Sequence, residues 1–288
     1  MGPSAIDQDI IDLLRQRVRT VETAIDRDLV VAAGPIYEGL ARQLHDALRG
    51  LATGRRKGVT VLLETDGGIV EVAERMAEMI RARYEHVEFL ILGSAMSAGT
   101  ILTMSGNRIV MDDYAALGPI DPQVQRGDVL VPAQSYIAQY ERLIERAARG
   151  VLTDAEFALI QSFDPAELHS FEQATQLSVA LLKTWLAEHK FRDWDKTEAS
   201  GRTVTRKMRE DRAEAIARDL ANHEKWHSHS RALSRNTLRE ALRLRIDDFE
   251  TLHAAAEDEL RRLHRGSLEY GQRMQFISFV LTRDGLAR

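Results

Sequence analysis

The sequence predicts an α/β fold in which a mostly parallel sheet is flanked by helices and followed by a helical C-terminal half. The first indication is the alternation of strand-like apolar runs with helical patterns, roughly every 20–30 residues, which is typical of a parallel sheet covered on both faces. The second is a change at Tyr136, after which helical periodicity dominates. The third is a composition of 44% apolar and 29% charged residues, which indicates a globular chain.

The elements of the first half follow from apolar patterns between glycine and proline breaks. An amphipathic pattern over residues 5–26 predicts a peripheral helix. The strands that we expect next cover residues 29–33, 59–63, 87–92 and 108–111. The helices expected between them cover residues 36–48, 69–84 and 97–105, and a turn over residues 118–123 ends this half.

The second half reads as helical to about residue 222, with interruptions near Asp154, Asp164 and Gly201. A basic stretch over residues 223–245 follows, then an expected helix over 247–264 and a short strand within 276–282. No repeat or low-complexity linker separates the two halves. We therefore place residues 1–130 in an α/β core with an N-terminal helix. Residues 131–288 form a mainly helical region that contributes to the site and to oligomer contacts.

Composition excludes several classes of function. The chain has no cysteine, which excludes disulfides, thiolate metal sites and cysteine nucleophiles, and its formal net charge of −5 makes no case for nucleic-acid binding. Residues 89–106 carry no charge, but the glycines and serines among them favour a buried strand, turn and helix over a membrane span. The first residues lack a basic start and an apolar signal core. We expect a cytoplasmic protein without a membrane span.

Two clusters of small residues carry the functional signal. Thr65-Asp66-Gly67-Gly68 and the stretch 93–100 (GSAMSAGT) each follow a strand-like run and precede a helical pattern. A strand that turns into a helix through small residues leaves backbone N–H groups pointing into the crevice above the sheet. Two such ends side by side can form an oxyanion hole, with the hydroxyl of Ser97 in the same crevice. This arrangement suggests a serine hydrolase.

Three segments in order carry a family resemblance: residues 64–75 (ETDGGIVEVAER), 95–100 (AMSAGT) and 117–123 (LGPIDPQ). They resemble the serine dehydrogenase proteinase family, a branch of the Clp-fold serine peptidases distantly similar to Clp peptidase and signal-peptide peptidase A. The resemblance covers about residues 55–125 and extends more loosely to 226–231 (WHSHSR). It implies a Clp/crotonase-like fold for the first half.

The resemblance also implies roles for individual residues. Ser97 matches the nucleophile, and the backbone N–H groups of Gly68 and Ala98 match the oxyanion hole. The family order of serine, aspartate and histidine points to Asp121 as the orienting acid, although an Asp-Pro pair is also a routine turn. Many relatives have proline or a small residue where this chain has Asp66. A carboxylate there would oppose negative charge in the oxyanion hole unless it points to solvent.

A serine nucleophile needs a base, and the turn over residues 118–123, after the strand that follows Ser97, holds no histidine. His229 is the first choice, because the segment around it resembles the late histidine segment of the family. The sequence does not separate it from His227, and His169 is a third candidate. Lysine serves as the base in some relatives of the fold, which adds Lys183 and Lys190.

Two other motifs compete with this interpretation. His223-Glu224-Lys225-Trp226-His227 matches the zinc peptidase pattern His-Glu-x-x-His, in which two histidines on one helix face bind zinc and the glutamate acts as base. A basic face formed by arginines could meet phosphate or an acidic partner, although the acidic residues near it favour an ordinary ion-paired surface. The arginines of this face are Arg231, Arg235, Arg239, Arg243 and Arg245.

The sequence as a whole favours a serine endopeptidase that cleaves unfolded or short peptides through an acyl-enzyme at Ser97. Relatives of the fold form rings or trimers through their helices, so we expect a homo-oligomer. No cofactor is expected, since the chain lacks a Gly-x-Gly-x-x-Gly motif, and no metal is expected. The alternative is a catalytically inactive scaffold with the same fold. The sequence does not indicate whether an ATPase partner is needed.

Overall fold

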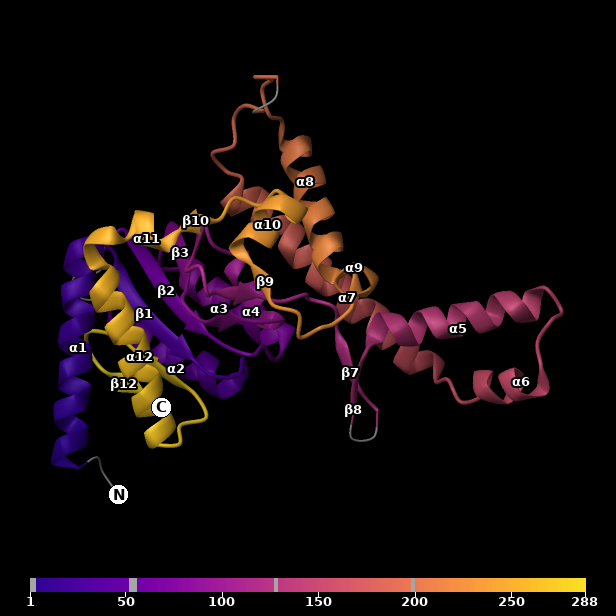
Figure 1. Ribbon diagram of the computed structural model, residues 1–288, viewed down its shortest axis with the longest axis horizontal. Helices are drawn as coiled ribbons and strands as arrows, with labels where there is room; N and C mark the ends of the chain where they lie inside the picture. Colours follow the sequence, from indigo (N-terminus) through magenta and orange to yellow (C-terminus); the bar gives the residue numbers. More distant parts are fainter. Residues whose placement is uncertain (1–3, 52–55, 127–128, 198–199) are drawn as a thin grey trace.

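A seven-stranded sheet with the strand order β10-β5-β3-β2-β1-β11-β12 forms the centre of the computed structural model (Figure 1). The structure describes residues 4–51, 56–126, 129–197 and 200–288. The middle strands pair in parallel and are β1 (Asp28–Ala33), β2 (Gly58–Glu64), β3 (His86–Ile91) and β5 (Arg108–Met111). The sheet is therefore mostly parallel, and the predicted α/β fold class is confirmed.

Successive residues of each middle strand face opposite sides of the sheet, and both sides are buried. In β1, Val30 and Ala32 belong to one apolar cluster, while Leu29 and Val31 belong to the other. The first cluster packs against α2 (Glu38–Gly50), α3 (Val70–Arg81) and α4 (Ala98–Thr103). The second packs against α1 (Ala5–Ile25) and α12 (Glu257–Arg273). Burial on both sides explains why these strands are continuously apolar in sequence.

The C-terminal half supplies the strands at both edges of the central sheet. The strand β10 (Asp247–Asp248) pairs with β5, and β11 (Phe279–Leu281) pairs antiparallel with β1 and with β12 (Leu286–Ala287). Without β10 and β11, the outer sides of β5 and β1 would expose unpaired backbone N–H and C=O groups. The late strands form hydrogen bonds with these groups. Residues 131–288 thus contribute strands to the core as well as helices.

The helices between residues 133 and 242 lie on the side of the sheet where β10 pairs with β5 (Figure 1). The arm formed by α5 (Ala133–Ala148) and α6 (Asp154–Ile160) projects from the body (Figure 1). After α6, α7 (Pro165–Trp185) continues into the π-helix η1 (Leu186–Lys190) and packs against α8 (Arg206–Ala221). The hairpin β7 (Gln123–Arg126) and β8 (Val129–Pro132) leads into the arm. Proline after the capping Asp164 and a capping box at Thr153 explain where α7 and α6 begin.

The second half differs from the prediction in one segment. The continuous helix expected over residues 247–264 is wrong: the segment contains β10, α11 (Phe249–Leu252), the 3-10 turn η2 (Ala254–Ala256) and the first half of α12. Pairing of residues 247–248 with β5 holds the start of this segment extended, so a helix begins only after it. The basic stretch before it contains the short helix α9 (His223–Trp226), the strand β9 (Leu233–Ser234) and the helix α10 (Arg235–Leu242).

The predicted elements of the first half agree closely with the observed ones. The uncharged stretch 89–106 forms the end of β3, the short strand β4 (Ser94–Ala95) and the buried helix α4, as the glycines and serines in it predict. Among the described residues, no helix has the length and apolar character that crossing a membrane requires.

A buried ion cluster fixes the end of the chain to the core. The guanidinium of Arg283 donates to Glu22 at 3.0 Å and to Asp28 at 2.6 Å. Glu22 is 2% exposed and Asp28 is fully buried, and Tyr84 donates to the second oxygen of Asp28 at 2.7 Å. Burial raises the pKa of Glu22, although the N–H of Leu29 and Arg283 counteract this effect. Among the described residues, Arg283 is thus a cation shared by two buried carboxylates.

We expect Arg283→Ala to lower the free energy of unfolding by about 3–5 kcal/mol, because it leaves two buried carboxylates without their cation. Chemical denaturation of the purified variant measures the loss. Arg149→Ala is the matched control, because Arg149 is 73% exposed and faces Glu145 at 3.5 Å on the surface of α5. The control should change stability by less than about 1 kcal/mol. Equal losses in the two variants would contradict a special role for the buried cluster.

Candidate active site

A three-stranded sheet brings three distant segments of the chain to one edge. Its strands are β4, β6 (Ala116–Leu117) and β9, with β6 in the middle. β4 and β6 are parallel, whereas β9 is antiparallel to β6, with Leu117 opposite Leu233. The ends of β4 and β6 therefore lie beside the beginning of β9. Ser97 follows β4, Asp121 follows β6 and His229 precedes β9, so the three residues border the same edge.

Ser97 has an unusual backbone conformation at the start of α4, with φ of 50° and ψ of −116°. A positive φ is uncommon outside glycine, and such strained residues cluster at active sites. Glycines crowd the position: a Cβ atom on Gly67 would lie 2.8 Å from the Cβ of Ser97, and one on Gly118 would lie 3.3 Å from its nitrogen. Ser97 is half-buried. Its position is thus fixed by backbone that only glycine permits.

The loop after β2 contributes backbone N–H groups beside Ser97. Gly67 and Gly68 have φ of 112° and 146°, and the carbonyl of Gly67 accepts from Ile36 at 2.8 Å. The N–H of Gly67 donates to the Thr65 hydroxyl. In the described part of the chain, the N–H groups of Gly68 and Ala98 donate to no protein group. They are therefore available to an external acceptor. The side chain of Asp66 is exposed.

Asp121 is fully buried and contacts two histidines of the C-terminal half. One carboxylate oxygen lies 2.9 Å from Nδ1 of His229, which is 108 residues away in the sequence. The other oxygen accepts from the side chain of Gln123 at 2.9 Å and lies 3.3 Å from Nδ1 of His223. A carboxylate on Nδ1 of a neutral imidazole holds the proton there and leaves Nε2 as the acceptor. With its proton on Nδ1, His229 would have Nε2 free to accept a proton.

The other candidate bases lie in different surroundings. His169 is exposed and lies 3.8 Å from Glu172 on α7, and His227 is exposed with a φ of 63° after the end of α9. A hydrogen bond with Glu214 raises the pKa of Lys183, which keeps it charged. Burial lowers the pKa of Lys190 to about 8, but this lysine interacts with Asp247 and Arg108. Arg108 is the first residue of β5, whereas Ser97 comes after the last residue of β3. Because β3 and β5 are parallel, Arg108 lies at the opposite end of the strands from the segment that leads to Ser97.

The zinc motif is not assembled as a metal site. α9 contains only four residues, and His227 lies beyond its end in a left-handed conformation. His223 instead faces Asp121. Across the described residues, a group of three possible metal ligands occurs only at Asp112, Asp113 and Glu250. That group already pairs with arginines, as Arg261 contacts Asp112 and Arg235 contacts Glu250.

The arginines of the predicted basic face mostly take part in local pairs. Arg235 and Arg239 both contact Asp248, at 3.1 and 3.0 Å, and Arg245 contacts Asp247 at 3.4 Å. Arg231 donates to the carbonyl of Trp226. These contacts agree with the interpretation of this region as an ion-paired surface.

Two contacts of the site were not foreseen in the sequence. His223 contacts Asp121, although the sequence suggested it only as a zinc ligand. Glu64, at the end of β2, accepts from the N–H and hydroxyl of Ser94 at 3.0 and 3.2 Å, and its other oxygen lies 2.9 Å from Nε2 of His264 on α12. Ser94 opens the strand that leads to Ser97. Glu64 thus connects the end of β2, the strand β4 and the helix α12. The sequence signal that could have indicated this contact is the charge of Glu64 at the end of the otherwise apolar strand β2.

A family model described as ClpP-like SDH-type serine proteinase matches residues 5–207. The chain belongs to this family. The predicted resemblance to the serine dehydrogenase proteinase branch of the Clp-fold peptidases is confirmed. Ser97 and Asp121 lie inside the matched range, whereas His229 and His264 lie beyond it.

Curated relatives and solved structures extend the comparison. Two uncharacterized proteins of Methanocaldococcus jannaschii are 29% identical over 135 residues and 27% identical over 143 residues. These matches cover 46% and 48% of this chain and the same shares of the relatives, so the chain spans about half the length of the curated relatives it matches.

Two mutant structures of the 1510-N membrane-bound stomatin-specific protease, one with a substrate peptide, are 11% and 14% identical to this chain. Each has a TM-score of 0.46. They cover 75% and 77% of this chain, and 76% and 75% of their own chains are matched.

We expect Gly67→Ala to abolish labelling of the protein by a fluorophosphonate probe, which reacts with activated serines. The added Cβ would lie 2.8 Å from that of Ser97, at a φ that side chains rarely adopt. Gly285→Ala is the matched control, because nothing lies within 4 Å of its added Cβ. Thermal unfolding of both variants separates a local change from loss of the fold. Labelling of a folded Gly67→Ala protein at the parent rate would contradict the close packing of the two segments.

Proposed function

We propose that this protein is a serine endopeptidase that cleaves unfolded or short peptides through an acyl-enzyme at Ser97. The observation that carries the proposal is the hydrogen bond between buried Asp121 and His229 at the edge of the small sheet that Ser97 also borders. A buried acid that orients a histidine, with a strained serine at the same end of the small sheet, supports a nucleophilic mechanism, which needs an acid, a base and a serine in reach of one another. Membership in the family of ClpP-like serine proteinases supports the same reaction class.

The proposed reaction begins when Nε2 of His229 accepts the proton of the Ser97 hydroxyl. The serine oxygen then forms a bond to the carbonyl carbon of the substrate, and the carbonyl oxygen becomes an oxyanion. The N–H groups of Gly68 and Ala98 donate to that oxyanion, and the Asp121 carboxylate stabilises the imidazolium. The imidazolium next protonates the leaving amine, which breaks the peptide bond. Water, activated by His229, hydrolyses the ester and regenerates the serine.

The surroundings of these residues favour this assignment over the other bases. Asp121 has a second histidine neighbour, His223, and accepts from Gln123, so its carboxylate is held on several sides. We assign His223 a positioning role, because its Nδ1 faces the acid. The exposed Asp66 leaves the oxyanion hole free of a facing carboxylate, because its charge is directed to solvent.

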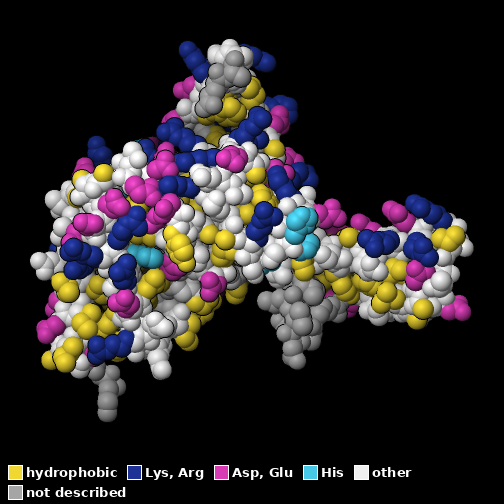
Figure 2. Space-filling model, viewed as in Figure 1, with side chains coloured by type: hydrophobic (Ala, Val, Ile, Leu, Met, Phe, Trp, Pro, Cys, Tyr) yellow, Lys and Arg dark blue, Asp and Glu magenta, His cyan; other side chains and the backbone are white. Residues whose placement is uncertain are grey.

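We also propose that the enzyme is a cytoplasmic homo-oligomer that meets its partners through the helical half. The arm of α5 and α6 projects from the body, and Figure 2 shows hydrophobic side chains along it. Its large exposed apolar residues are Ile144, Val151, Phe157 and Leu159. Association through this arm would cover them, and an assembly would restrict access to unfolded or short peptides.

Ser97→Ala should remove peptidase activity and fluorophosphonate labelling while leaving the thermal midpoint unchanged. Loss of the nucleophile leaves only the contribution of the oxyanion hole and of binding, so we expect kcat to fall by at least about 10³-fold. Cleavage of a library of unstructured fluorogenic peptides measures the rate. Ser162→Ala, on the exposed turn after α6, should keep the parent rate. Activity of Ser97→Ala within about tenfold of the parent would overturn the serine mechanism.

His229→Ala and Asp121→Asn should each lower kcat by about 10³–10⁴-fold, because the first removes the base and the second favours the wrong tautomer. His223→Ala should cost less than about tenfold, and exposed His169→Ala should cost nothing. Steady-state kinetics with the same peptides give each effect. A full rate in His229→Ala, with a severe loss in His227→Ala or His169→Ala, would assign the base differently. Absence of labelling in the parent protein at every oligomeric state would favour the inactive scaffold.

A further inference from the structure

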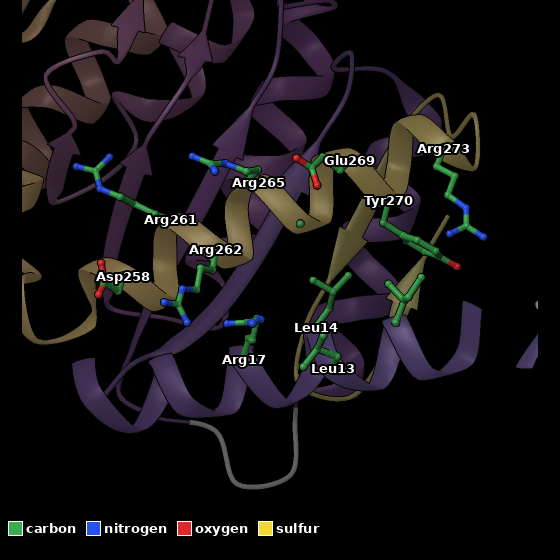
Figure 3. Close-up of a pocket in the computed structure, with 12 residues that line it drawn as sticks. Leu13, Leu14, Arg17, Asp258, Arg261, Arg262, Arg265, Glu269, Tyr270 and Arg273 are labelled. Carbon is green, nitrogen blue, oxygen red and sulfur yellow. The ribbon is translucent and has the colours of Figure 1, made fainter. Parts of the chain in front are cut away.

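A groove with a volume of about 620 Å³ lies between α1 and α12, as Figure 3 shows. The two helices run antiparallel: Arg17 pairs with Glu259 near one end, and Asp7 lies 3.6 Å from Arg273 at the other. Both helices pack on the sheet face opposite α4, so the groove opens on a different face of the sheet from the helix that Ser97 precedes. The reaction proposed above uses none of the residues that line it.

The floor of the groove is apolar and partly open to solvent. Ile10, Leu13 and Leu14 contribute from α1, and Gly266 and Tyr270 contribute from α12. Leu13 is 49% exposed, and Ile6, one turn before Ile10, is 63% exposed. Large apolar side chains of α1 therefore face outward on one stripe instead of toward the core. Gly266 has no side chain to fill the space, and an added Cβ there would touch Leu14 at 3.5 Å.

Arginines of α12 border this floor and are weakly engaged within the chain. Arg265 is exposed and makes no ion pair with any described residue. Arg262 lies 3.9 Å from Glu259 and Arg273 lies 3.6 Å from Asp7, both longer than hydrogen bonds. The other charged groups at the groove are Arg17, Arg261, Asp258 and Glu269. Arg17 and Arg261 already have close carboxylate partners, which leaves three arginines available to a ligand.

Tyr270 adds a polar group without a partner. Its side chain is 4% exposed, and its hydroxyl makes no hydrogen bond within the described chain. Figure 3 shows the ring projecting from α12 toward α1. A buried hydroxyl without a hydrogen-bond partner costs free energy. A ligand whose acceptor atom reached the Tyr270 hydroxyl would form the missing hydrogen bond and remove this cost. Burial raises the pKa of this tyrosine, so it remains a neutral donor.

We propose that this groove binds an amphipathic, acidic helix of a partner protein. A concave seam between two antiparallel helices accepts the apolar ridge of a third helix, whose flanking carboxylates would meet Arg262, Arg265 and Arg273. The stretch of α1 from Ile6 to Arg17 is about 17 Å long at 1.5 Å per residue, which fits about three turns of helix. A flat membrane surface would fit less well, because part of the apolar surface lies at the floor of the groove.

Binding in this groove would leave the Ser97 edge open, because α4 lies on the other face of the sheet. The groove is therefore suited to recruiting a partner or a tethered substrate, and not to blocking the catalytic edge. The inference stands independently of the proposed peptidase reaction, since it concerns a different face of the molecule.

Fluorescence anisotropy with the full chain tests the proposal. The probe is a labelled 14-residue helical peptide with leucines on one face and glutamates beside them, and its matched control has lysines in place of the glutamates. We expect saturable binding of the acidic peptide, at least tenfold weaker binding of the lysine peptide, and weakening of the acidic complex as salt increases. Arg262→Glu combined with Arg265→Glu should weaken binding at least tenfold, as should Leu13→Asp.

Arg149→Glu, on the surface of α5, is the control and should bind like the parent, and thermal unfolding confirms that each variant is folded. Failure of the acidic peptide to bind, or equal binding by the arginine variant, would overturn the proposal. Binding to vesicles of phosphatidylglycerol and phosphatidylcholine that the arginine variant loses, without peptide binding, would assign the groove to a membrane instead. A dimer that Leu13→Asp dissociates would assign it to self-association. Peptidase assays of the same variants keep the test separate from the catalytic proposal.

Discussion

The buried carboxylate of Asp121 is the constraint on which the arrangement of the two halves depends. A carboxylate without solvent is strongly destabilising unless hydrogen-bond donors surround it. Among the described residues, the side chains that hydrogen-bond to this carboxylate are Gln123 from the first half and His229 from the second, and His223 lies 3.3 Å away. The segment before β9 is therefore drawn across the end of β6. The same contact that satisfies the buried charge also orients the histidine, so stability and the proposed chemistry share one interaction.

The pairing of the short strands β6 and β9 positions His229 relative to Asp121. β9 joins β6 through only two residue pairs, but that register sets where the histidine segment begins. The C-terminal segments serve the core in a similar way, because β10 and β11 cover strands that would otherwise be open. His264 on α12 extends the dependence to the loop beside Ser97 through Glu64. The second half is thus an integral part of the site and not an appendage to a complete domain.

The two proposals of catalysis and partner binding concern opposite faces of the central sheet. The face covered by α2, α3 and α4 is more extensive and leads to the proposed catalytic edge, where glycines allow close backbone contacts. The face covered by α1 and α12 is closed by only two long helices, whose seam retains apolar side chains and arginines at the surface. A partner on the second face would be held by the same α12 that contacts Glu64, while the proposed catalytic site on the other face remained accessible. The proposed recruitment and the proposed catalysis would therefore use different faces of the sheet.

The sequence by itself determined the elements of the first half, because continuous apolar runs and glycine breaks are local signals. It also predicted the strand-to-helix turn at Ser97, the candidate nucleophile, since the small residues around it fit such a turn. It did not determine the partners of Asp121, because His229, His227 and His223 look alike in a stretch of seven residues. Tertiary structure decided that His229 and His223 face the carboxylate, through a strand pairing more than 100 residues away in sequence. For the same reason the break in the expected helix over 247–264 was decided by pairing with β5, a long-range hydrogen-bond pattern that local periodicity does not contain.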